Sequence, residues 1–428
     1  MPAILLSIGD ELTLGQTVDT NAAWLSAKLS GLGIACSEHR TVSDDLDRIA
    51  LNIQQCAALA EVLIITGGLG PTDDDLTRPA LAKAMGVELI EDPASVEHIA
   101  AYFHGRGRDM PLRNRVQATH PMTSTMIENT CGTAPGIRAT LGQCEIFVTP
   151  GVPREMFAMY QRDIEPAIKA MASTTRTILT AKLNSFGSGE SDIAEKLGPL
   201  MARDRNPVVG TTVSNGYVSV RIRSEHDDIR KAHAELDRTL ALVKEKVGPL
   251  AFGQDETTLQ EAVIALLVEQ GKTIATAESC TGGMIAGMLT DVAGSSAAVL
   301  GGWVTYANAM KVEQLGVPLA LIEQHGAVSR EVVEAMAQGA LERSGADFAL
   351  STSGIAGPGG GTADKPVGTV WIGMAWREGE TTHIGARLAR LAGDRENIRD
   401  RSAKCALQLL RLKLMGEDLD QLKWASKP

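Results

Sequence analysis

The stretch ALAEVLIITGG (58–68) is an unbroken apolar run that ends in two glycines. Such a run is typical of a strand that is buried on both faces of a parallel sheet. Two runs of the same kind, AILLSIG (3–9) and CEIFVTPG (144–151), lie on either side of it along the chain. Apolar residues at helical spacing separate the three runs, at 21–33 and 78–86. The alternation of strands and helices predicts an α/β domain whose parallel sheet is covered on both faces.

The same alternation resumes in the last third of the 428-residue chain, which is long enough for two or three domains. Between the two α/β segments, the alternating strand GYVSVRIRS (216–224) and a long charged helix predict a small α+β domain. We expect breaks at ASTTRT (172–177) and just before a new helix that Asp255 or Thr257 caps. The predicted fold is therefore two α/β domains with parallel or mixed sheets joined by a small α+β domain, at 1–170, 256–428 and 175–252 respectively.

Composition excludes several classes of protein. Hydrophobic residues make up 44% of the chain, the formal net charge is −11 and no long Lys/Arg run occurs, so we expect no direct binding of nucleic acid or of an anionic membrane. No apolar run approaches the roughly 20 residues of a membrane helix. The six cysteines form no CxxC pair, which argues against a structural zinc site and a disulfide framework. Because the first apolar run has no basic leader before it, we expect a cytoplasmic protein.

Four loops of the first domain carry glycines or carboxylates: 9–22, 66–77, 132–136 and 149–156. They follow predicted strands or lie in loops, and ligands bind at the carboxyl edge of an open parallel sheet. A helix that starts near Asp74 would add its positive end to this edge. Taken alone, TGGLGPT fits a tight strand-to-helix connection equally well, and three successive aspartates fit a solvated helix start. The coincidence of four loops favours a pocket for a phosphorylated ligand with a divalent metal.

The motifs GDELTLGQTVDTNA, TGGLGPTDDD and PGVPREM resemble the N-terminal signature of the CinA (competence/damage-inducible) family. That domain is similar to the MoaB/MogA molybdopterin-binding fold, and the family is described as having a metal-dependent ADP-ribose pyrophosphatase activity. The resemblance implies that Asp10, Asp73 and Asp74 hold Mg²⁺ or a similar ion. It also implies a nucleotide pocket lined by Thr66, Gly67, Gly68 and Gly70. One departure is Asp19, where the family pattern has asparagine.

The last domain has no Ser-His-Asp signature, so a hydrolase here needs another general base. A lysine serves if burial lowers its pKa, and Lys311 at the end of VTYANAMK (304–311) is the candidate. Three serines are candidate nucleophiles, Ser279 in AESCTGG (277–283), Ser296 in GSS (294–296) and Ser353 in SGIAGPGGG (353–361). The neighbouring Cys280 has no histidine partner in its motif and is interpreted as a packing residue. The predicted helix after Ser279 would offer an anion the N–H groups of Thr281, Gly282 and Gly283, and the glycine-rich loop would offer oxyanion donors that include Gly354.

These C-terminal motifs resemble the nicotinamide mononucleotide (NMN) amidohydrolase domain of the same family, which is described as a Ser/Lys enzyme without a cofactor. The resemblance implies functional roles for Ser279, Ser296, Tyr306, Lys311, Ser353 and Arg395. We interpret Ser296 as the nucleophile, because it is closer in sequence to its base Lys311, with Tyr306 assisting proton transfer. Ser279 and Ser353 would orient the substrate, and Arg395 would pair with its phosphate.

The predicted function is therefore hydrolysis of NMN by the last domain and of ADP-ribose by the first. Two other functions stay open. The chain could bind these nucleotides as a regulatory or scaffold protein without turnover, or it could handle molybdopterin, which only the fold of the first domain suggests. The family resemblance also implies a homodimer.

Overall fold

The computed structural model describes residues 1–171 and 177–426. The chain divides into two compact units. The N-terminal unit comprises Met1–Leu179 with Glu225–His233, and the C-terminal unit comprises Thr180–Ser224 with Ala234–Pro428. The expected break at 172–177 lies almost wholly outside the described residues.

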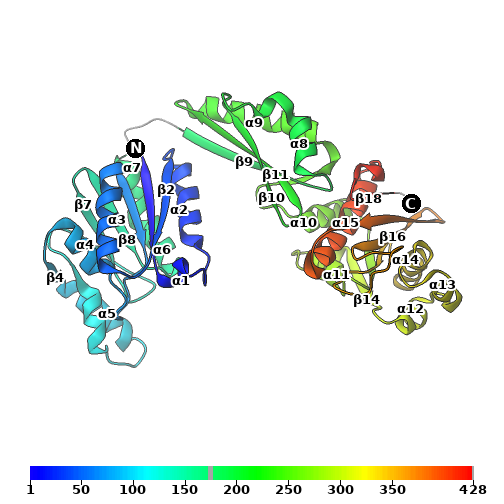
Figure 1. Cartoon of the computed structure of the whole chain (residues 1–428), viewed down its shortest axis with the longest axis horizontal. Coiled ribbons are helices and arrows are strands. Elements are labelled where there is room, and N and C mark those ends of the chain that lie inside the picture. The colour runs from blue at the N-terminus through cyan, green and yellow to red at the C-terminus, as the bar shows by residue number, and fades with distance from the viewer. Residues whose placement is uncertain (172–176, 427–428) are drawn as a thin grey trace. The chain divides into compact units, whose positions relative to one another are not determined.

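The N-terminal unit is built on a six-stranded sheet of order β2-β1-β3-β8-β7-β6 (Figure 1). All residues of two of its inner strands, β1 (Ala3–Ile8) and β3 (Val62–Thr66), are buried, as the apolar runs predict. Strands β2, β1, β3 and β8 run parallel. The remaining strands of this unit are β2 (Cys36–Val42), β4 (Leu89–Glu91), β5 (Thr119–Pro121), β6 (Thr125–Ile127), β7 (Gly136–Leu141) and β8 (Cys144–Thr149).

The sheet is mixed rather than wholly parallel, because β7 pairs antiparallel with β8 and with β6. Only residues 142 and 143 join β7 to β8, and a two-residue connection can only return the chain antiparallel. Gly142, with φ of +63°, makes this tight turn possible. The α/β class is thus confirmed for this unit.

Two hydrophobic cores cover the two faces of this sheet. Alternate residues of β1 divide between them: Ile4 and Leu6 pack with α3 and α4, whereas Leu5 packs with α2 and α6. This division explains why β1 is apolar at successive positions. The helices of this unit are α1 (Asp10–Thr13), α2 (Thr20–Gly31), α3 (Leu46–Leu59), α4 (Thr77–Met85), α5 (Pro93–His104), α6 (Pro153–Met159) and α7 (Glu165–Met171).

The C-terminal unit contains two sheets. Three elements, at 177–186, 217–226 and 229–247, have their first or last residues in the N-terminal unit but most of their residues in the C-terminal unit, so they are described with it. A four-stranded sheet has the order β10-β11-β9-β12, and α8 and α9 belong with it. A six-stranded sheet has the order β14-β13-β15-β16-β17-β18, and the remaining helices of the unit belong with that sheet. In the larger sheet, β14, β13 and β15 are parallel and the other neighbours are antiparallel. The strands are β9 (Thr177–Phe186), β10 (Val208–Ser214), β11 (Tyr217–His226), β12 (Ala251–Gln254), β13 (Ile274–Glu278), β14 (Val299–Val304), β15 (Phe348–Gly354), β16 (Thr369–Glu378), β17 (Thr381–Arg390) and β18 (Ala425–Ser426).

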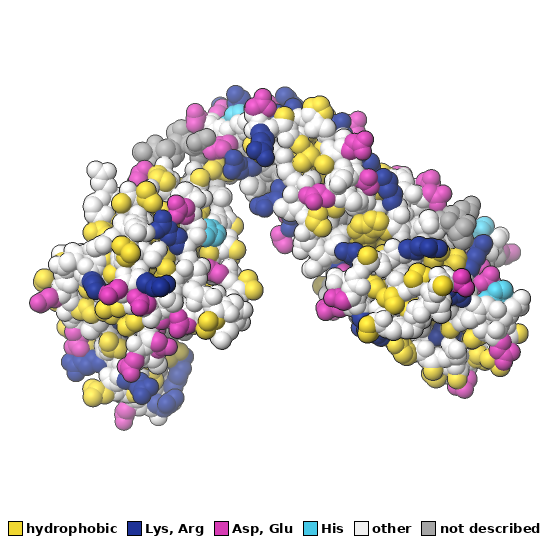
Figure 2. All heavy atoms as spheres, viewed as in Figure 1, with side chains coloured by type: hydrophobic (Ala, Val, Ile, Leu, Met, Phe, Trp, Pro, Cys, Tyr) yellow, Lys and Arg dark blue, Asp and Glu magenta, His cyan; other side chains and the backbone are white. Residues whose placement is uncertain are grey.

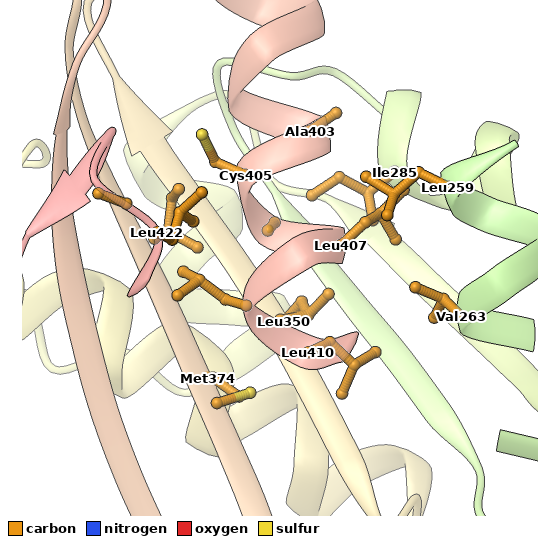
Figure 3. Close-up of a cluster of buried hydrophobic side chains, with 14 of the residues drawn as sticks. Leu259, Val263, Ile285, Leu350, Met374, Ala403, Cys405, Leu407, Leu410 and Leu422 are labelled. Atoms are coloured by element: carbon orange, nitrogen blue, oxygen red, sulfur yellow. The ribbon is translucent and has the colours of Figure 1, made fainter. Parts of the chain in front are cut away.

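The last helix, α15, packs on one face of the larger sheet. Figure 3 shows Leu407 and Leu410 of this helix between Val263 and Ile285 of neighbouring helices and Leu350 of a central strand. Helix α14 and its neighbours cover the opposite face. The helices of this unit are α8 (Glu190–Leu197), α9 (Ile229–Val247), α10 (Leu259–Glu269), α11 (Met284–Thr290), α12 (Asn308–Leu315), α13 (Leu319–His325), α14 (Arg330–Ser344) and α15 (Arg395–Leu414).

The two sheets of the C-terminal unit share one hydrophobic core. Phe186 and Phe252 of the smaller sheet belong to the same buried cluster as the leucines of α15. The ring of Phe186 lies 4.9 Å from that of Trp424. The helix predicted to follow Asp255 or Thr257 begins at Leu259, and Thr258 caps it instead. The side chain of Thr258 accepts the N–H of Glu261 in the first turn.

Charged side chains of both signs are interspersed over the face shown in Figure 2. Of the helices in the described part of the chain, none is long and apolar enough to cross a membrane.

Candidate functional site

A cavity of about 510 Å³ opens at the carboxyl ends of β1, β3 and β8, and we call it the N-terminal cavity. All four of the loops that the sequence singles out contribute to its lining. Predicted residues Thr66, Gly67, Gly68, Gly70 and Asp74 line it. Parallel strands bring these loops together because their carboxyl ends share one edge.

Backbone contacts explain the glycines of the loop after β3. Gly67 and Gly68 have φ of +103° and +65°, a region that favours glycine. A Cβ at Gly67 would overlap the carbonyl oxygen of Ile8, and one at Gly68 would overlap Oγ1 of Thr77. Helix α4 begins at Thr77 rather than near Asp74, and its first N–H donates to the carbonyl of Gly68 at 3.2 Å. That N–H therefore has a partner within the chain.

A buried arginine holds the same loop from beneath. Arg78 is 2% exposed and donates to the carbonyl oxygens of Leu69 at 2.7 Å and Gly70 at 2.6 Å. Burial lowers the pKa of its guanidinium to about 10. The carboxylate of Asp75 closes the turn by accepting the N–H groups of Gly70 and Thr72. The loop is thus fixed before any ligand binds.

The lining of the N-terminal cavity is acidic. It includes six carboxylates and no lysine, arginine or histidine. Burial is the main factor that raises the pKa of one of them, Asp44, and neighbouring carboxylates add to this, although a hydrogen bond from the N–H of Asp10 opposes it. The six are Glu11, Asp19, Asp44, Asp74, Asp75 and Glu155.

The expected metal triad of Asp10, Asp73 and Asp74 is not assembled. Asp10 and Asp73 are absent from the cavity lining, and the carboxylate of Asp10 accepts the N–H of Asp44 at 3.2 Å. Within residues 1–171 and 177–426, no three His, Cys, Asp or Glu side chains gather as a metal-binding group. The protein alone therefore forms no complete metal cage. A cation at this edge would need oxygen ligands from a bound molecule, as Mg²⁺ commonly takes from phosphates.

A second cavity, of about 190 Å³, lies at the carboxyl ends of β13 and β15, and we call it the C-terminal cavity. Five of the predicted residues line it together with Gly354. Its lining contains no aspartate or glutamate. The lining residues are Ser279, Cys280, Tyr306, Asn308, Lys311, Ala327, Val328, Ser353, Gly354, Ala356 and Arg395.

Lys311 and Ser279 meet at the floor of this cavity. The side chain of Lys311 is 1% exposed, and its Nζ lies 3.2 Å from Oγ of Ser279. The same Nζ donates to the carbonyl oxygens of Thr305 at 2.9 Å and Tyr306 at 3.2 Å. Burial lowers the pKa of Lys311 below its ordinary 10.5, because desolvation disfavours the charged amine. An amine whose pKa is lowered gives up its own proton more readily and can then accept the proton of a neighbouring hydroxyl, which activates a serine.

Ser296 is exposed in the 3-10 turn Ser295–Ala297, which precedes β14, whereas Lys311 follows β14 on α12. The six residues of β14 span about 20 Å between the two ends of the strand. Ser296 is absent from the lining of the C-terminal cavity. The expected pairing of Ser296 with Lys311 is therefore corrected to a pairing of Ser279 with Lys311.

The helix start after Ser279 is closed by a glutamate. Both carboxylate oxygens of Glu278 accept N–H groups from the start of α11, including that of Gly283 at 3.0 Å. The N–H of Gly282 donates to the carbonyl of Ser279, and the hydroxyl of Thr281 pairs with that of Thr352. Thr281, Gly282 and Gly283 do not line the cavity, so the expected anion site is corrected to an internal cap.

The remaining predicted residues lie at the walls and mouth. Arg395 donates to the carbonyl of Gly357 at 2.8 Å and to the hydroxyl of Tyr306 at 3.1 Å. Tyr306 is 62% exposed, so its phenol stands at the mouth, with its hydroxyl on Arg395. Ser353 is buried and donates to the carbonyl of Ala327 at 2.7 Å. Cys280 is 6% exposed, and burial raises the pKa of its thiol to about 12, which suits a packing residue.

Comparison with known proteins identifies the family to which the chain is similar. Residues 4–170 match the model of a "probable molybdopterin binding domain", residues 180–253 the "damage-inducible protein CinA KH domain" and residues 256–414 the "CinA C-terminal domain". The chain is 40% identical to the "CinA-like protein" of Geobacter sulfurreducens over 97% of its own length and 100% of that protein. The chain belongs to the CinA family. The "CinA-like protein" of Synechococcus sp. CC9902 is 39% identical, with 96% of this chain and 98% of that protein covered.

Among solved structures, a "competence/damage inducible protein" of Agrobacterium tumefaciens is 44% identical to this CinA protein. The match covers 37% of this chain and 93% of the Agrobacterium chain, with a TM-score of 0.35. The match of the middle segment to a KH domain adds a module class that often binds single-stranded nucleic acid, whereas composition predicts no direct binding for this CinA chain.

Sequence reasoning missed residues in both CinA cavities. Asp44 follows β2 in the same way that Asp10 follows β1, but β2 is polar and mostly exposed, so its sequence gives no strand signal. Glu155 stands in a quoted motif without an assigned role. In the second cavity, Asn308 had no signal beyond its place in VTYANAMK. Glu278 of AESCTGG lies outside the cavity lining, and its role as the cap of the following helix was also missed.

Proposed function

We propose that the C-terminal cavity hydrolyses the carboxamide of NMN to nicotinate mononucleotide and ammonia, with Ser279 as nucleophile and Lys311 as general base. The observation that carries the proposal is the 3.2 Å contact between Nζ of the buried Lys311 and Oγ of Ser279. Family members that are amidohydrolases support the reaction class.

The chemistry follows from these two groups. Neutral Lys311 takes the hydroxyl proton while Oγ of Ser279 bonds to the carboxamide carbon, and the carbonyl π bond opens to an oxyanion. The oxyanion then reforms the carbonyl, the C–N bond breaks, and the nitrogen leaves as ammonia with the proton from Lys311. Water attacks the resulting ester, Lys311 takes its proton and returns it to Ser279, and the acid is released. The proton of the Ser279 hydroxyl leaves with ammonia and a proton from water replaces it, so the enzyme is regenerated.

Charge supports a phosphorylated substrate. The C-terminal cavity contains no carboxylate and has Arg395 at its mouth. The volume of about 190 Å³ suits a single aromatic ring better than a whole nucleotide. We therefore propose that the pyridine ring enters the cavity and the phosphate stays at the mouth, where Arg395 pairs with it.

The test is release of ammonia and nicotinate mononucleotide from NMN, measured for the wild type and for Ser279→Ala, Ser296→Ala and Lys311→Met. The matched control is Lys404→Met, which removes another buried lysine that donates to Asn215 and Asp400 away from the cavity. Loss of turnover in the Ser279 and Lys311 variants alone is expected. A Ser279→Ala variant that keeps wild-type turnover refutes the nucleophile.

We further propose that the N-terminal cavity cleaves ADP-ribose to AMP and ribose 5-phosphate, with a divalent cation that the substrate shares. The observation that favours this is a lining with six carboxylates and no lysine, arginine or histidine, because such a surface repels a bare pyrophosphate. A cation between phosphate oxygens and Asp74 or Asp44 would remove the repulsion. The test is turnover of ADP-ribose with Mg²⁺ and with EDTA, and turnover that EDTA leaves unchanged refutes the proposal.

Binding without turnover and molybdopterin handling are the alternatives. A chain that binds NMN and ADP-ribose but converts neither would support the first, and retention of molybdopterin would support the second. We also propose that the protein is a homodimer that works in the cytoplasm. The six free cysteines suit a reducing compartment, and the exposed Leu300 and Val304 of edge strand β14 suit an interface between copies. Sedimentation of the full chain tests the dimer.

A further inference from the structure

Two charged side chains hold the turn that carries Ser279. Glu278 is fully buried at the end of β13. Its Oε2 accepts the N–H groups of Gly283 and Ile285, both at 3.0 Å, and its Oε1 accepts that of Ala286 at 2.8 Å. These are N–H groups that a helix start leaves without partners in the helix. Because both oxygens act as acceptors, the group behaves as a carboxylate at the positive end of α11.

Arg399 binds the carbonyl oxygens of the same turn. Its Nε donates to the carbonyl of Cys280 at 3.1 Å and its Nη2 to the carbonyl of Thr281 at 2.8 Å. The guanidinium reaches these oxygens across Gly282, where a Cβ would lie 3.2 Å from Nη2. The N–H groups and the carbonyls of the turn are thus fixed from opposite sides by opposite charges.

We propose that Glu278 and Arg399 are a pair of positioning residues that hold Oγ of Ser279 against Nζ of Lys311. This inference rests on the proposed amidohydrolase function. Gly282 and Gly283 have φ of +64° and +93°, and glycines of this kind give the turn many alternative conformations. The pair removes that freedom. A displacement of about 1 Å at a reacting atom costs about 10²-fold in rate.

The pair acts through Ser279, so the two variants Glu278→Gln and Arg399→Gln should lower kcat about 10- to 100-fold and leave KM within about twofold. Their charges give a second readout. Loss of the negative carboxylate disfavours protonated Lys311, so the acid limb of the pH–rate profile moves to lower pH. Loss of the positive guanidinium moves that limb to higher pH. The other ionisable groups of the cavity, Cys280, Tyr306 and Arg395, are the same in both variants.

Two matched controls remove the same kinds of interaction elsewhere. Glu261→Gln removes the carboxylate that accepts the N–H and hydroxyl of Thr258 at the start of the neighbouring helix α10. Arg411→Gln removes a guanidinium of α15 that donates to the carbonyls of Pro249 and Ala251. Both controls should lower the melting temperature and leave kcat and the pH–rate profile as in the wild type. Arg399→Lys, which reaches one carbonyl, should restore part of kcat.

The experiment measures NMN turnover against pH for the wild type, the pair and the controls. A wild type without turnover refutes the proposed function. In that case the positioning role is tested alone, by the rate at which phenylmethanesulfonyl fluoride labels Ser279, measured by intact mass. Slower labelling in both variants supports positioning. Three outcomes overturn the positioning proposal. The two variants keep the wild-type kcat and labelling rate, their pH–rate profiles shift in the same direction, or the controls lose as much kcat as the variants do. If Glu278→Gln fails to fold, Arg399→Gln carries the test.

Discussion

Replacement of Lys311 by methionine tests the central feature of the C-terminal cavity, a lysine buried to 1% exposure without a carboxylate in the cavity lining. Methionine preserves much of the apolar length but has no amine. Loss of a general base costs about 10²–10⁴-fold in rate. Nicotinamide mononucleotide turnover should therefore fall to about 1% or less of the wild type, with KM little changed, because the amine contacts the nucleophile rather than the phosphate.

The same variant should change how stability depends on pH. Burial lowers the pKa of Lys311 in the folded chain below its ordinary 10.5. Between the lowered pKa and 10.5, the unfolded chain binds a proton that the folded chain does not, so stability rises with pH in this window. One proton contributes at most about 1.4 kcal/mol per pH unit. Below the lowered pKa both states are protonated, and Lys311 adds no slope.

Urea unfolding at several pH values from about 7 to about 10 measures this slope. Four of the five tryptophans, Trp303, Trp371, Trp376 and Trp424, lie in the C-terminal unit. A Trp24→Phe background therefore makes fluorescence report on that unit alone. The free energy of unfolding of the wild type minus that of Lys311→Met should rise with pH, since other titrating groups cancel. Parallel curves, or a variant with more than about a tenth of wild-type turnover, would refute the reasoning.

Three further outcomes are expected. Ser279→Ala should abolish ammonia release from NMN, whereas Ser296→Ala, on an exposed turn, should keep it within about twofold of the wild type; end-point ammonia assays separate them. Arg395→Gln should raise KM for NMN about 10-fold and leave KM for the dephosphorylated riboside unchanged, which steady-state kinetics measures. Asp74→Asn should remove cation-dependent ADP-ribose cleavage, and Asp73→Asn, which lies outside the cavity lining, should not.

Much of the fold follows from local sequence signals. The apolar runs that become β1, β3 and β8 are buried on both faces, so apolar residues occupy successive positions on both sides of each strand. The ends of helices at glycines could also be predicted, as at Gly86, which takes a left-handed conformation after α4. The edge strand β2 is mostly exposed, and a strand without a buried face leaves no apolar pattern to read. That is why Asp44 was missed.

The expected pairing of Ser296 with Lys311 failed for a reason that topology explains. Proximity in sequence favoured Ser296, but a strand lies between it and Lys311. Ser279 and Lys311 each follow one of two adjacent parallel strands, and the register pairs Glu278 with Val304 at their carboxyl ends. Residues that follow neighbouring parallel strands meet, whereas residues at opposite ends of one strand do not. The chemistry of Lys311 was readable from the sequence, and its partner required the sheet order.

The two cavities carry opposite charge, and this restricts what each accepts. The N-terminal cavity has six carboxylates and no cationic side chain in its lining, whereas the C-terminal cavity has Arg395 at its mouth and no carboxylate. A nucleotide phosphate meets repulsion at the first unless a cation accompanies it, and attraction at the second without one. Chelation should therefore separate the two proposed activities: EDTA removes the cation that the first cavity needs for its substrate and leaves the second cavity unaffected. Excess Mg²⁺ should slow NMN turnover at the second cavity, because it competes with Arg395 for the phosphate.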